Sequence, residues 1–211
     1  MATRTLSPFL HWLTAPALPG TFNPWRDHDP ATDRSPRAAA ERLARLCAHL
    51  STRPAWLLVG EAAGYQGCKV SGIPFTSERL LLEGRIPRIA APRRRLSTRE
   101  RPWSEPSATT VWGTLHALGV AHATLLWNAF PFHPHQRGDL HSNRTPTRDE
   151  RAFGLAVLAA LLRAFPRARP IAVGRQAAAA FAELGMAVPT VRHPSMGGAA
   201  EFRRGMARLM G

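Results

Sequence analysis

Short apolar runs alternate with amphipathic segments along most of the chain. Four of these runs predict buried strands: residues 55–59 (AWLLV), 123–128 (ATLLWN), 170–174 (PIAVG) and 188–192 (VPTVR). They lack the strict alternation of apolar and polar residues that a half-exposed strand shows, which is typical of strands covered on both faces. The order of strands and helices therefore predicts an α/β fold, a three-layer α/β/α sandwich around a central four-stranded, mostly parallel sheet.

Helices are expected where a capping residue precedes an apolar-faced segment. Ser35 before Pro36, Ser107, and the capping box of residues 147–150 (TRDE) each predict a helix start. The expected helices are residues 35–50, a short one within 79–84 (RLLLEG), 107–119, 147–165, 175–185, and a basic helix at the end of the sequence.

The first part of the chain has a different composition from the rest. Residues 1–34 are rich in proline, aspartate and aromatic residues, and we expect them to form an ordered arm packed on a domain of residues 35–211. Residues 1–20 hold one arginine and a short apolar patch broken by His11 and prolines. We interpret that patch as a first helix or part of the arm, with a weak signal peptide as the alternative.

Bulk composition is that of a globular domain. Of 211 residues, 45% are hydrophobic and 20% charged, and no stretch approaches the roughly 20 uninterrupted apolar residues that span a bilayer. Two cysteines, Cys47 and Cys68, are too few for a disulfide scaffold or a four-thiolate cluster. We expect a cytoplasmic protein with no membrane partner and no obligate protein partner, hence a monomer.

Charge indicates the class of partner. The sequence holds 28 Lys and Arg against 14 Asp and Glu, a net charge of +14, and Lys69 is the only lysine. Codon bias can favour arginine over lysine, but it does not create an excess of cations over anions. Such a surplus favours a polyanion, and nucleic acid is preferred over a membrane surface because no convincing basic amphipathic helix is present.

A basic, proline-interrupted segment concentrates part of this charge. Residues 85–101 (RIPRIAAPRRRLSTRER) contain seven arginines and one acid. We expect Arg93, Arg94 and Arg95 to hold DNA phosphates, and the alternative is a solvated surface loop.

Unusual residues occur where the predicted strands end. Residues 60–78 (GEAAGYQGCKVSGIPFTSE) follow the first strand, Asn128 ends the second, Gly174 ends the third, and His193 follows the fourth. Because the carboxyl ends of parallel strands meet at one edge of a sheet, a site there would collect these residues. Glycines in such loops let backbone N–H groups approach a flat or phosphorylated ligand.

This ordered set resembles the uracil-DNA glycosylase superfamily. The resemblance rests on GEAAGYQG and SGIPF after the first strand, Asn128 closing the second and HPS (193–195) after the fourth, and it spans roughly residues 55–200. It implies a small α/β/α domain that flips uracil out of DNA and hydrolyses its N-glycosidic bond, leaving an abasic site. Uracil-containing DNA is the expected partner.

The resemblance also implies roles for three side chains. Phe75, after the rigid Pro74, would stack on the uracil ring, and the Asn128 amide would pair with uracil N3–H and O4, a pattern that cytosine reverses. His193 would donate a hydrogen bond to uracil O2, where negative charge gathers as the bond breaks. The structural alternatives are a core phenylalanine, a strand-end cap and a loop histidine.

The sequence departs from the family where water is activated. The best-known branch carries an aspartate two residues after the first glycine of the motif, and this chain has Ala62 there. Glu61 matches an acid of the iron–sulfur branch and is the candidate for orienting water, with hydrogen bonding to nearby backbone N–H groups as the alternative. Cys47 and Cys68 cannot supply the four ligands of that branch, so no cluster and no other cofactor is expected.

Further residues of the two loops are assigned to base and DNA. Gly60, Ala62 and Tyr65 are expected at the base; Tyr65 lies one residue beyond Gly64, the place where another branch carries a tyrosine that excludes thymine.

The loop after the fourth strand is expected to contact DNA. Ser195, Met196 and Gly197 are assigned to it: Met196 matches the apolar wedge that fills the vacated stack, and Gly197 allows close approach to a phosphate. Met196 could equally be an ordinary methionine. Arg175 is expected to meet a phosphate or to cap the sheet edge.

One lysine and a pair of histidines are candidates for different chemistry. Lys69 is expected on the surface, so no lysine is placed to form a Schiff base and the enzyme is expected to be monofunctional. His133 and His135 lack a third ligand and are interpreted as loop residues near DNA, not as a metal site. A uracil-DNA or abasic-site binding protein with little turnover, and a general basic DNA-binding scaffold, remain alternatives.

Overall fold

The computed structural model describes residues 9–14 and 17–211. Its main sheet has the strand order β3-β2-β5-β6, with every neighbouring pair parallel. The strands are β2 (Trp56–Ala62), β3 (Thr124–Phe130), β5 (Arg169–Val173) and β6 (Thr190–Val191). The predicted four-stranded parallel sheet is confirmed, although Glu61 and Asn128 lie within longer strands than the apolar runs predicted.

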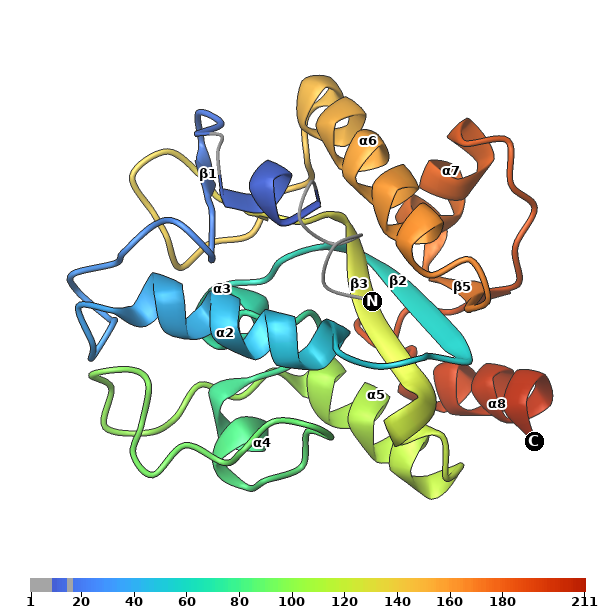
Figure 1. Cartoon of the computed structure of the whole chain (residues 1–211), viewed down its shortest axis with the longest axis horizontal. Helices are drawn as coiled ribbons and strands as arrows, with labels where there is room; N and C mark the ends of the chain where they lie inside the picture. The colour runs from blue at the N-terminus through green and yellow to red at the C-terminus, as the bar shows by residue number, and fades with distance from the viewer. Residues whose placement is uncertain (1–8, 15–16) are drawn as a thin grey trace.

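Helices cover both faces of this sheet, which confirms the three-layer arrangement (Figure 1). On one face lie α6 (Arg148–Ala164) and α7 (Arg175–Glu183), and on the other lie α5 (Pro106–Ala117) and α8 (Ala199–Met210). The remaining helices are α2 (Ala38–Leu50), α3 (Cys68–Ser71), α4 (Glu78–Leu82), the 3₁₀ turn η1 (Ala121–Ala123), and residues 9–14.

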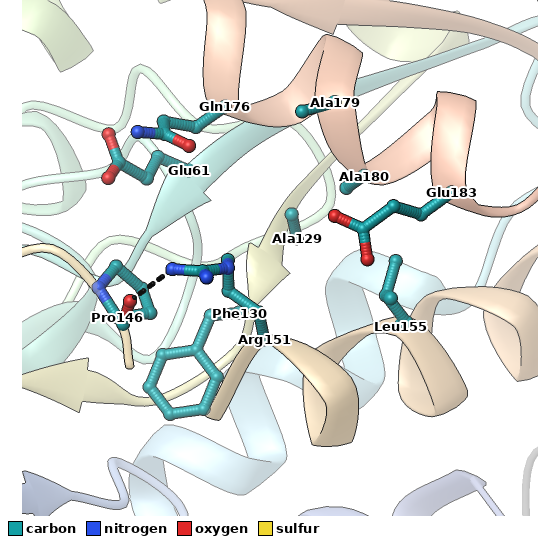
Figure 2. A pocket seen from close by; sticks show the side chains of 10 residues that line it. All are labelled: Glu61, Ala129, Phe130, Pro146, Arg151, Leu155, Gln176, Ala179, Ala180 and Glu183. Carbon is teal, nitrogen blue, oxygen red and sulfur yellow. Dashed lines mark hydrogen bonds between the residues drawn. The ribbon is translucent and has the colours of Figure 1, made fainter. Parts of the chain in front are cut away.

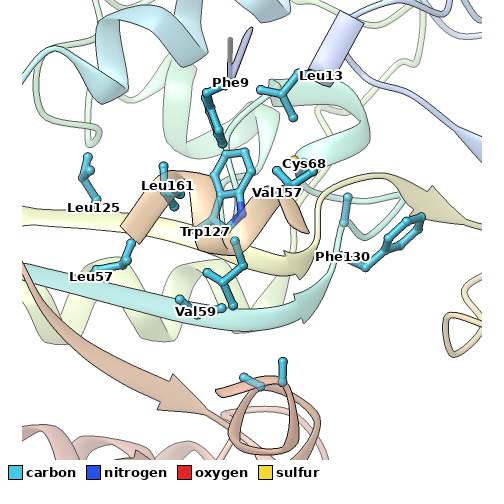
Figure 3. Packing of buried hydrophobic residues seen from close by; sticks show 14 of the residues in the cluster. Phe9, Leu13, Leu57, Val59, Cys68, Leu125, Trp127, Phe130, Val157 and Leu161 are labelled. Atoms are coloured by element: carbon cyan, nitrogen blue, oxygen red, sulfur yellow. The ribbon is translucent and has the colours of Figure 1, made fainter. Parts of the chain in front are cut away.

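Trp127 lies at the centre of the larger hydrophobic cluster (Figure 3). It is fully buried; its ring centroid lies 5.2 Å from that of Phe9 and 6.0 Å from that of Trp25, which stacks on it. Because successive strand residues point to opposite faces, Leu126 and Asn128 of β3 face the other layer, where Leu126 joins the cluster formed with α5 and α8. The strand pattern thus places Asn128 on the α5 side of the sheet.

The edge strand β3 is covered by α2. The backbone N–H of Leu126 donates to Nε2 of His49 at 3.1 Å, and both residues are fully buried. Burial lowers the pKa of His49 to about 3, so the imidazole is neutral and can accept this bond. Because β3 is an edge strand, the Leu126 N–H would otherwise lack an acceptor, and His49 supplies one.

A second, two-stranded sheet lies outside the sequence predictions. Strand β1 (Thr21–Phe22) pairs antiparallel with β4 (His133–Pro134). Strands of two residues have too little length for any hydrophobic period to show. His133 is fully buried, and each ring nitrogen lies about 3 Å from a backbone carbonyl, so it is a buried strand residue and not the loop residue that was expected.

Lys69 is buried, and the prediction that it lies on the surface was wrong. Its side chain is 2% exposed, and its Nζ lies 2.6 Å from Oδ2 of Asp29. Arg42 forms a similar buried pair with Asp33, 2.7 Å between Nη1 and Oδ1. The carboxylates therefore stabilise these charges inside the fold, and both come from the segment preceding α2. The division of the chain at residue 34 stays a prediction.

Two of the predicted helix starts were displaced. Helix α2 begins at Ala38, and Ser35 instead accepts a hydrogen bond from the Arg37 N–H at 3.1 Å, one turn earlier. Helix α5 begins at Pro106 and not after Ser107. Proline is tolerated at the first helical position because the N–H groups of the first turn have no partner within the helix. The capping box at α6 is confirmed: Thr147 and Glu150 exchange both side-chain-to-backbone hydrogen bonds.

The arginine-rich segment 85–101 is held by one buried carboxylate. Glu78 is fully buried, and its two oxygens accept hydrogen bonds from the N–H groups of Leu96, Ser97 and Trp103 and from the Ser97 hydroxyl, at 2.7–2.9 Å. The segment is consequently anchored at its C-terminal half.

Within the described residues, no helix is long and apolar enough to span a membrane.

Candidate active site

Gly60 brings an aromatic ring and an amide together on one face of the sheet. Gly60 of β2 and Asn128 of β3 are partners in the parallel register. A Cβ atom at Gly60 would overlap the Phe75 ring, with Cε2 at 2.6 Å, and would lie 3.0 Å from the Asn128 side chain. Only glycine therefore lets the ring of Phe75 lie directly on the strand beside the Asn128 amide.

Phe75 holds an unusual backbone conformation to reach this place. Its φ of 51° is in the left-handed region, which non-glycine residues rarely adopt. The ring is 6% exposed, and its centroid lies 5.8 Å from that of His193 at an interplanar angle of 35°. Strain of this kind persists where the surroundings over-determine it, and it is enriched at ligand sites.

His193 is oriented from two directions. Its Cβ lies 3.1 Å from where a Cβ of Gly174 would be, so the end of β5 supports the side chain. The backbone N–H of Ser195 donates to Nδ1 at 3.2 Å, and the Ser195 hydroxyl lies 2.7 Å from the same atom. Since an N–H can only donate, Nδ1 is the acceptor and the proton of the neutral ring is on Nε2.

The charge state of His193 follows from its surroundings. Burial lowers its pKa, and the nearby positive charge of Arg192 lowers it further. The imidazole is therefore a neutral Nε2–H donor at physiological pH.

The amide of Asn128 is partly engaged by the backbone. In the orientation that matches its neighbours, Nδ2 donates to the Trp127 carbonyl at 3.2 Å and Oδ1 accepts from the Ala63 N–H at 3.3 Å. Asn128 is 3% exposed. One N–H and one oxygen lone pair stay available, a donor and an acceptor side by side on one group.

These three side chains line one cleft of about 890 Å³. The sequence predicted several of its other lining residues, namely Glu61, Ala62, Ser195 and Met196. It missed other residues that line the cleft, among them Glu105, Asn143 and Arg144. The volume is in the range of a small-ligand site, and polar side chains surround the one phenyl ring that lines it.

Glu61 follows Gly60 in β2, so its side chain points to the opposite face of the sheet from the one on which Phe75 packs against Gly60. Figure 2 shows its carboxylate beside Gln176 of α7, at the mouth of a second cavity of about 340 Å³ that also contains Arg151 and Glu183. Glu61 thus lines this second cavity as well as the cleft, and also a cavity of about 840 Å³ that His193 shares. Among the described residues it has no hydrogen-bond partner, and burial raises its pKa.

The turn after His193 projects an apolar side chain. Met196 is 90% exposed, lines the cleft, and has a φ of 51°. It is followed by Gly197 with a φ of 77°, and the Gly198 N–H closes the turn on the Ser195 carbonyl at 3.0 Å. A strained turn therefore presents a large apolar group to solvent at the cleft.

Other candidates lie away from the cleft. The Tyr65 ring packs edge-on against Trp103, with centroids 5.5 Å apart, and Tyr65 is not among the residues lining the cleft. Arg175 lines a neighbouring cavity of about 840 Å³, which His193 shares. The structure therefore does not bring these two residues to the ring of Phe75.

The arginine cluster forms a separate site on the surface. Arg93, Arg94 and Arg95 line a cavity of about 420 Å³ together with Arg34 and Arg45.

Within residues 9–14 and 17–211, no group of three or more potential metal ligands occurs.

Comparison with known proteins gives a family match and matches to solved structures. The family model described as "UDG: Uracil DNA glycosylase superfamily" matches residues 47–206, well over half of the chain. The crystal structure of wild-type SMUG2 from Pedobacter heparinus matches with a TM-score of 0.64 and 13% sequence identity, covering 98% of this chain and 94% of that chain. At this identity the likeness shows the fold. No curated protein matches the sequence.

Proposed function

Because the chain belongs to the uracil-DNA glycosylase superfamily, we propose that it removes uracil from DNA by hydrolysing the N-glycosidic bond. The observation that carries this proposal is the meeting of Phe75, Asn128 and His193 in one cleft, around a glycine that leaves room for the ring. These groups come from distant parts of the sequence, and together they match the face and the polar edge of one pyrimidine.

Base recognition depends on the amide of Asn128. Its free oxygen lone pair accepts from uracil N3–H, and its free N–H donates to uracil O4. Cytosine presents an acceptor at N3 and a donor at position 4, so both buried groups would face like groups. Leaving them unpaired costs about 1–3 kcal/mol each, which rejects cytosine even after it has left the duplex.

Bond cleavage depends on His193. As the C1′–N1 bond breaks, the electron pair leaves with the base and negative charge gathers on O2. The Nε2–H donor strengthens its hydrogen bond as that charge grows, so it stabilises the transition state more than bound uracil. One donor of this kind contributes about 2.7–4 kcal/mol, or a factor of 10²–10³ in rate.

Access to a base within a duplex requires that the vacated stack be filled. The exposure and the fixed turn of Met196 support its role as the wedge, since an apolar side chain between base steps stabilises the unstacked state. The arginines provide the electrostatic attraction to the backbone phosphates.

The proposed enzyme is monofunctional. A glycosylase that also cleaves the sugar–phosphate backbone needs an amine to attack C1′, and Lys69, the sole lysine, is buried in its pair with Asp29. Lys69 is not among the residues lining the cleft.

The test is excision from oligonucleotides that carry uracil, thymine, cytosine, hypoxanthine or ethenocytosine, read out by alkaline cleavage. We expect excision of uracil, and loss of about 10²–10³ in single-turnover rate for His193→Ala and Asn128→Ala. His122→Ala, a change at an exposed histidine, is the matched control. Wild-type rates in both site variants would refute the assignment, and a burst without further turnover would identify a product-retaining binding protein.

A further inference from the structure

Glu105 is a carboxylic acid in the wall of the cleft that sequence reasoning overlooked. It directly precedes α5 and lines the same cleft as Phe75, Asn128 and His193. Its carboxyl group lies against the backbone of Gly67, where a Cβ atom would overlap Oε2 and would lie 2.9 Å from Cδ. The glycine-rich loop after β2 and the start of α5 therefore meet at this carboxyl group.

The carboxyl group of Glu105 is not engaged in holding the fold. Within the described residues, no hydrogen bond or ion pair reaches its oxygens, whereas Glu78 accepts four hydrogen bonds and Glu150 pairs with Arg144. Burial raises the pKa of Glu105 to about 7. A half-buried acid without a partner among the described residues, in a cleft with room for a ligand, is available to act on that ligand.

Two residues, Ala62 and Glu61, stand where sequence motifs place the water-activating acid. Ala62 has no polar group, and Glu61 directs its carboxylate to Gln176 at the border with the α7 layer (Figure 2). Glu105 lines the same cleft as Phe75, Asn128 and His193, so water held by its carboxyl group would lie in the cavity that receives the nucleotide.

We propose that Glu105 is the general base of the hydrolysis, an inference that rests on the proposed function. The C1′–N1 bond breaks and its electron pair leaves with the base. A water oxygen forms the new bond to C1′ while one of its protons passes to the Glu105 carboxylate, and the other stays as the hydroxyl of the abasic sugar. The proton then passes from the carboxyl group to the uracil anion or to solvent, which restores the carboxylate.

Other ionisable groups of the cleft determine how the pH dependence is read. They are Glu61 from β2, Cys68 from α3, Arg144 from the segment before α6, and His193 after β6. Burial raises the pKa of the Cys68 thiol, which stays protonated, and burial lowers the pKa of His193, which stays neutral near pH 7. Only the two glutamates can therefore produce a rise in rate with pH near neutrality.

The experiment is a profile of single-turnover uracil excision from about pH 5 to about pH 9. For the wild type we expect the rate to rise as the base ionises and to level off above about pH 7, because only the carboxylate accepts a proton. Glu105→Gln should lower the plateau by about 10²–10⁴ and remove the rise, with unchanged affinity for a non-hydrolysable 2′-fluoro uracil oligonucleotide. Glu105→Asp should restore part of the plateau together with the rise.

Two further variants make the test decisive. Glu201→Gln changes an exposed carboxylate on α8 and should behave as wild type. If Glu61→Gln removes the rise and Glu105→Gln keeps it, the base is Glu61 and the inference is overturned. It is also overturned if Glu105→Gln cleaves at the wild-type rate, while uracil excision itself, and so the proposed function, would stand. If Glu105→Gln does not fold, Glu105→Asp replaces it in the test. The inference then requires that Glu105→Asp lowers the plateau while Glu61→Gln keeps the wild-type profile, and any other result overturns it.

Discussion

Replacing Gly60 with alanine should disable the cleft while leaving every polar group in place. The new Cβ atom would stand 2.6 Å from Cε2 of Phe75 and 3.0 Å from the Asn128 side chain, whereas ordinary contacts begin near 3.4 Å. The ring must therefore retreat by roughly 1 Å from the strand. Its backbone already has a φ of 51°, so little freedom exists to absorb that movement.

The expected cost has two parts. Overpacking in a close-packed interior destabilises by about 1–3 kcal/mol. A displacement of about 1 Å in a group that positions the substrate lowers the rate by about 10²-fold. Single-turnover excision at a temperature where circular dichroism shows the variant folded measures the second effect, and guanidinium denaturation measures the first.

Gly113→Ala is the matched control. Gly113 lies on an exposed side of α5, and a Cβ atom there meets nothing within 4 Å. Alanine in that helix interior should stabilise by about 0.5–1 kcal/mol and leave excision unchanged. If Gly60→Ala excised uracil within about threefold of the wild-type rate, the account of the cleft as a slot bounded by the bare strand would be wrong.

Three other predictions follow from buried charges and from the exposed turn. Glu78→Ala should lower the free energy of unfolding by about 3 kcal/mol or more in guanidinium titrations, because four donors lose their acceptor, whereas Glu83→Ala at the exposed pair of α4 should change it by less than about 0.5 kcal/mol. Burial by itself would raise the pKa of Asp29, but the hydrogen bond and charge of Lys69 outweigh it and lower the pKa to about 2. The stabilisation is therefore complete above the ordinary pKa of 3.8 and is lost as pH falls toward about 2, and in Lys69→Met, which should cost about 3–5 kcal/mol, acid titration followed by fluorescence should lose that component. Met196→Ala should leave the melting temperature unchanged, since the side chain is 90% exposed, and should slow excision from duplex DNA at least about fivefold more than from single strands; equal slowing on both substrates would contradict the wedge role.

The sheet could be predicted from the sequence because its strands are continuous apolar runs. That pattern fixes which segments are strands, and the parallel arrangement then fixes which ends meet. Asn128 and His193 were found because each stands next to such a run. The alternation within β2 separates Gly60 from Glu61 and directs the Glu61 carboxylate toward the α7 layer.

Residues whose environment comes from distant loops could not be predicted in the same way. Lys69 stands in a glycine-rich segment that resembles an exposed loop, and only the carboxylate of Asp29, forty residues earlier, makes its burial possible. Glu105 before a proline is an ordinary helix start in sequence. Its place in the cleft depends on contact with Gly67, which is far away in the chain.

The enclosed lysine has a consequence for how the protein holds a polyanion. With that amine sequestered, the remaining permanent cations are all guanidinium groups, which keep their proton far into the alkaline range. Attraction to a phosphate backbone is then nearly insensitive to alkalinity and responds to ionic strength instead. Between neutral and moderately alkaline pH, changes in excision rate should therefore reflect the chemical step and not a loss of affinity for the phosphate backbone.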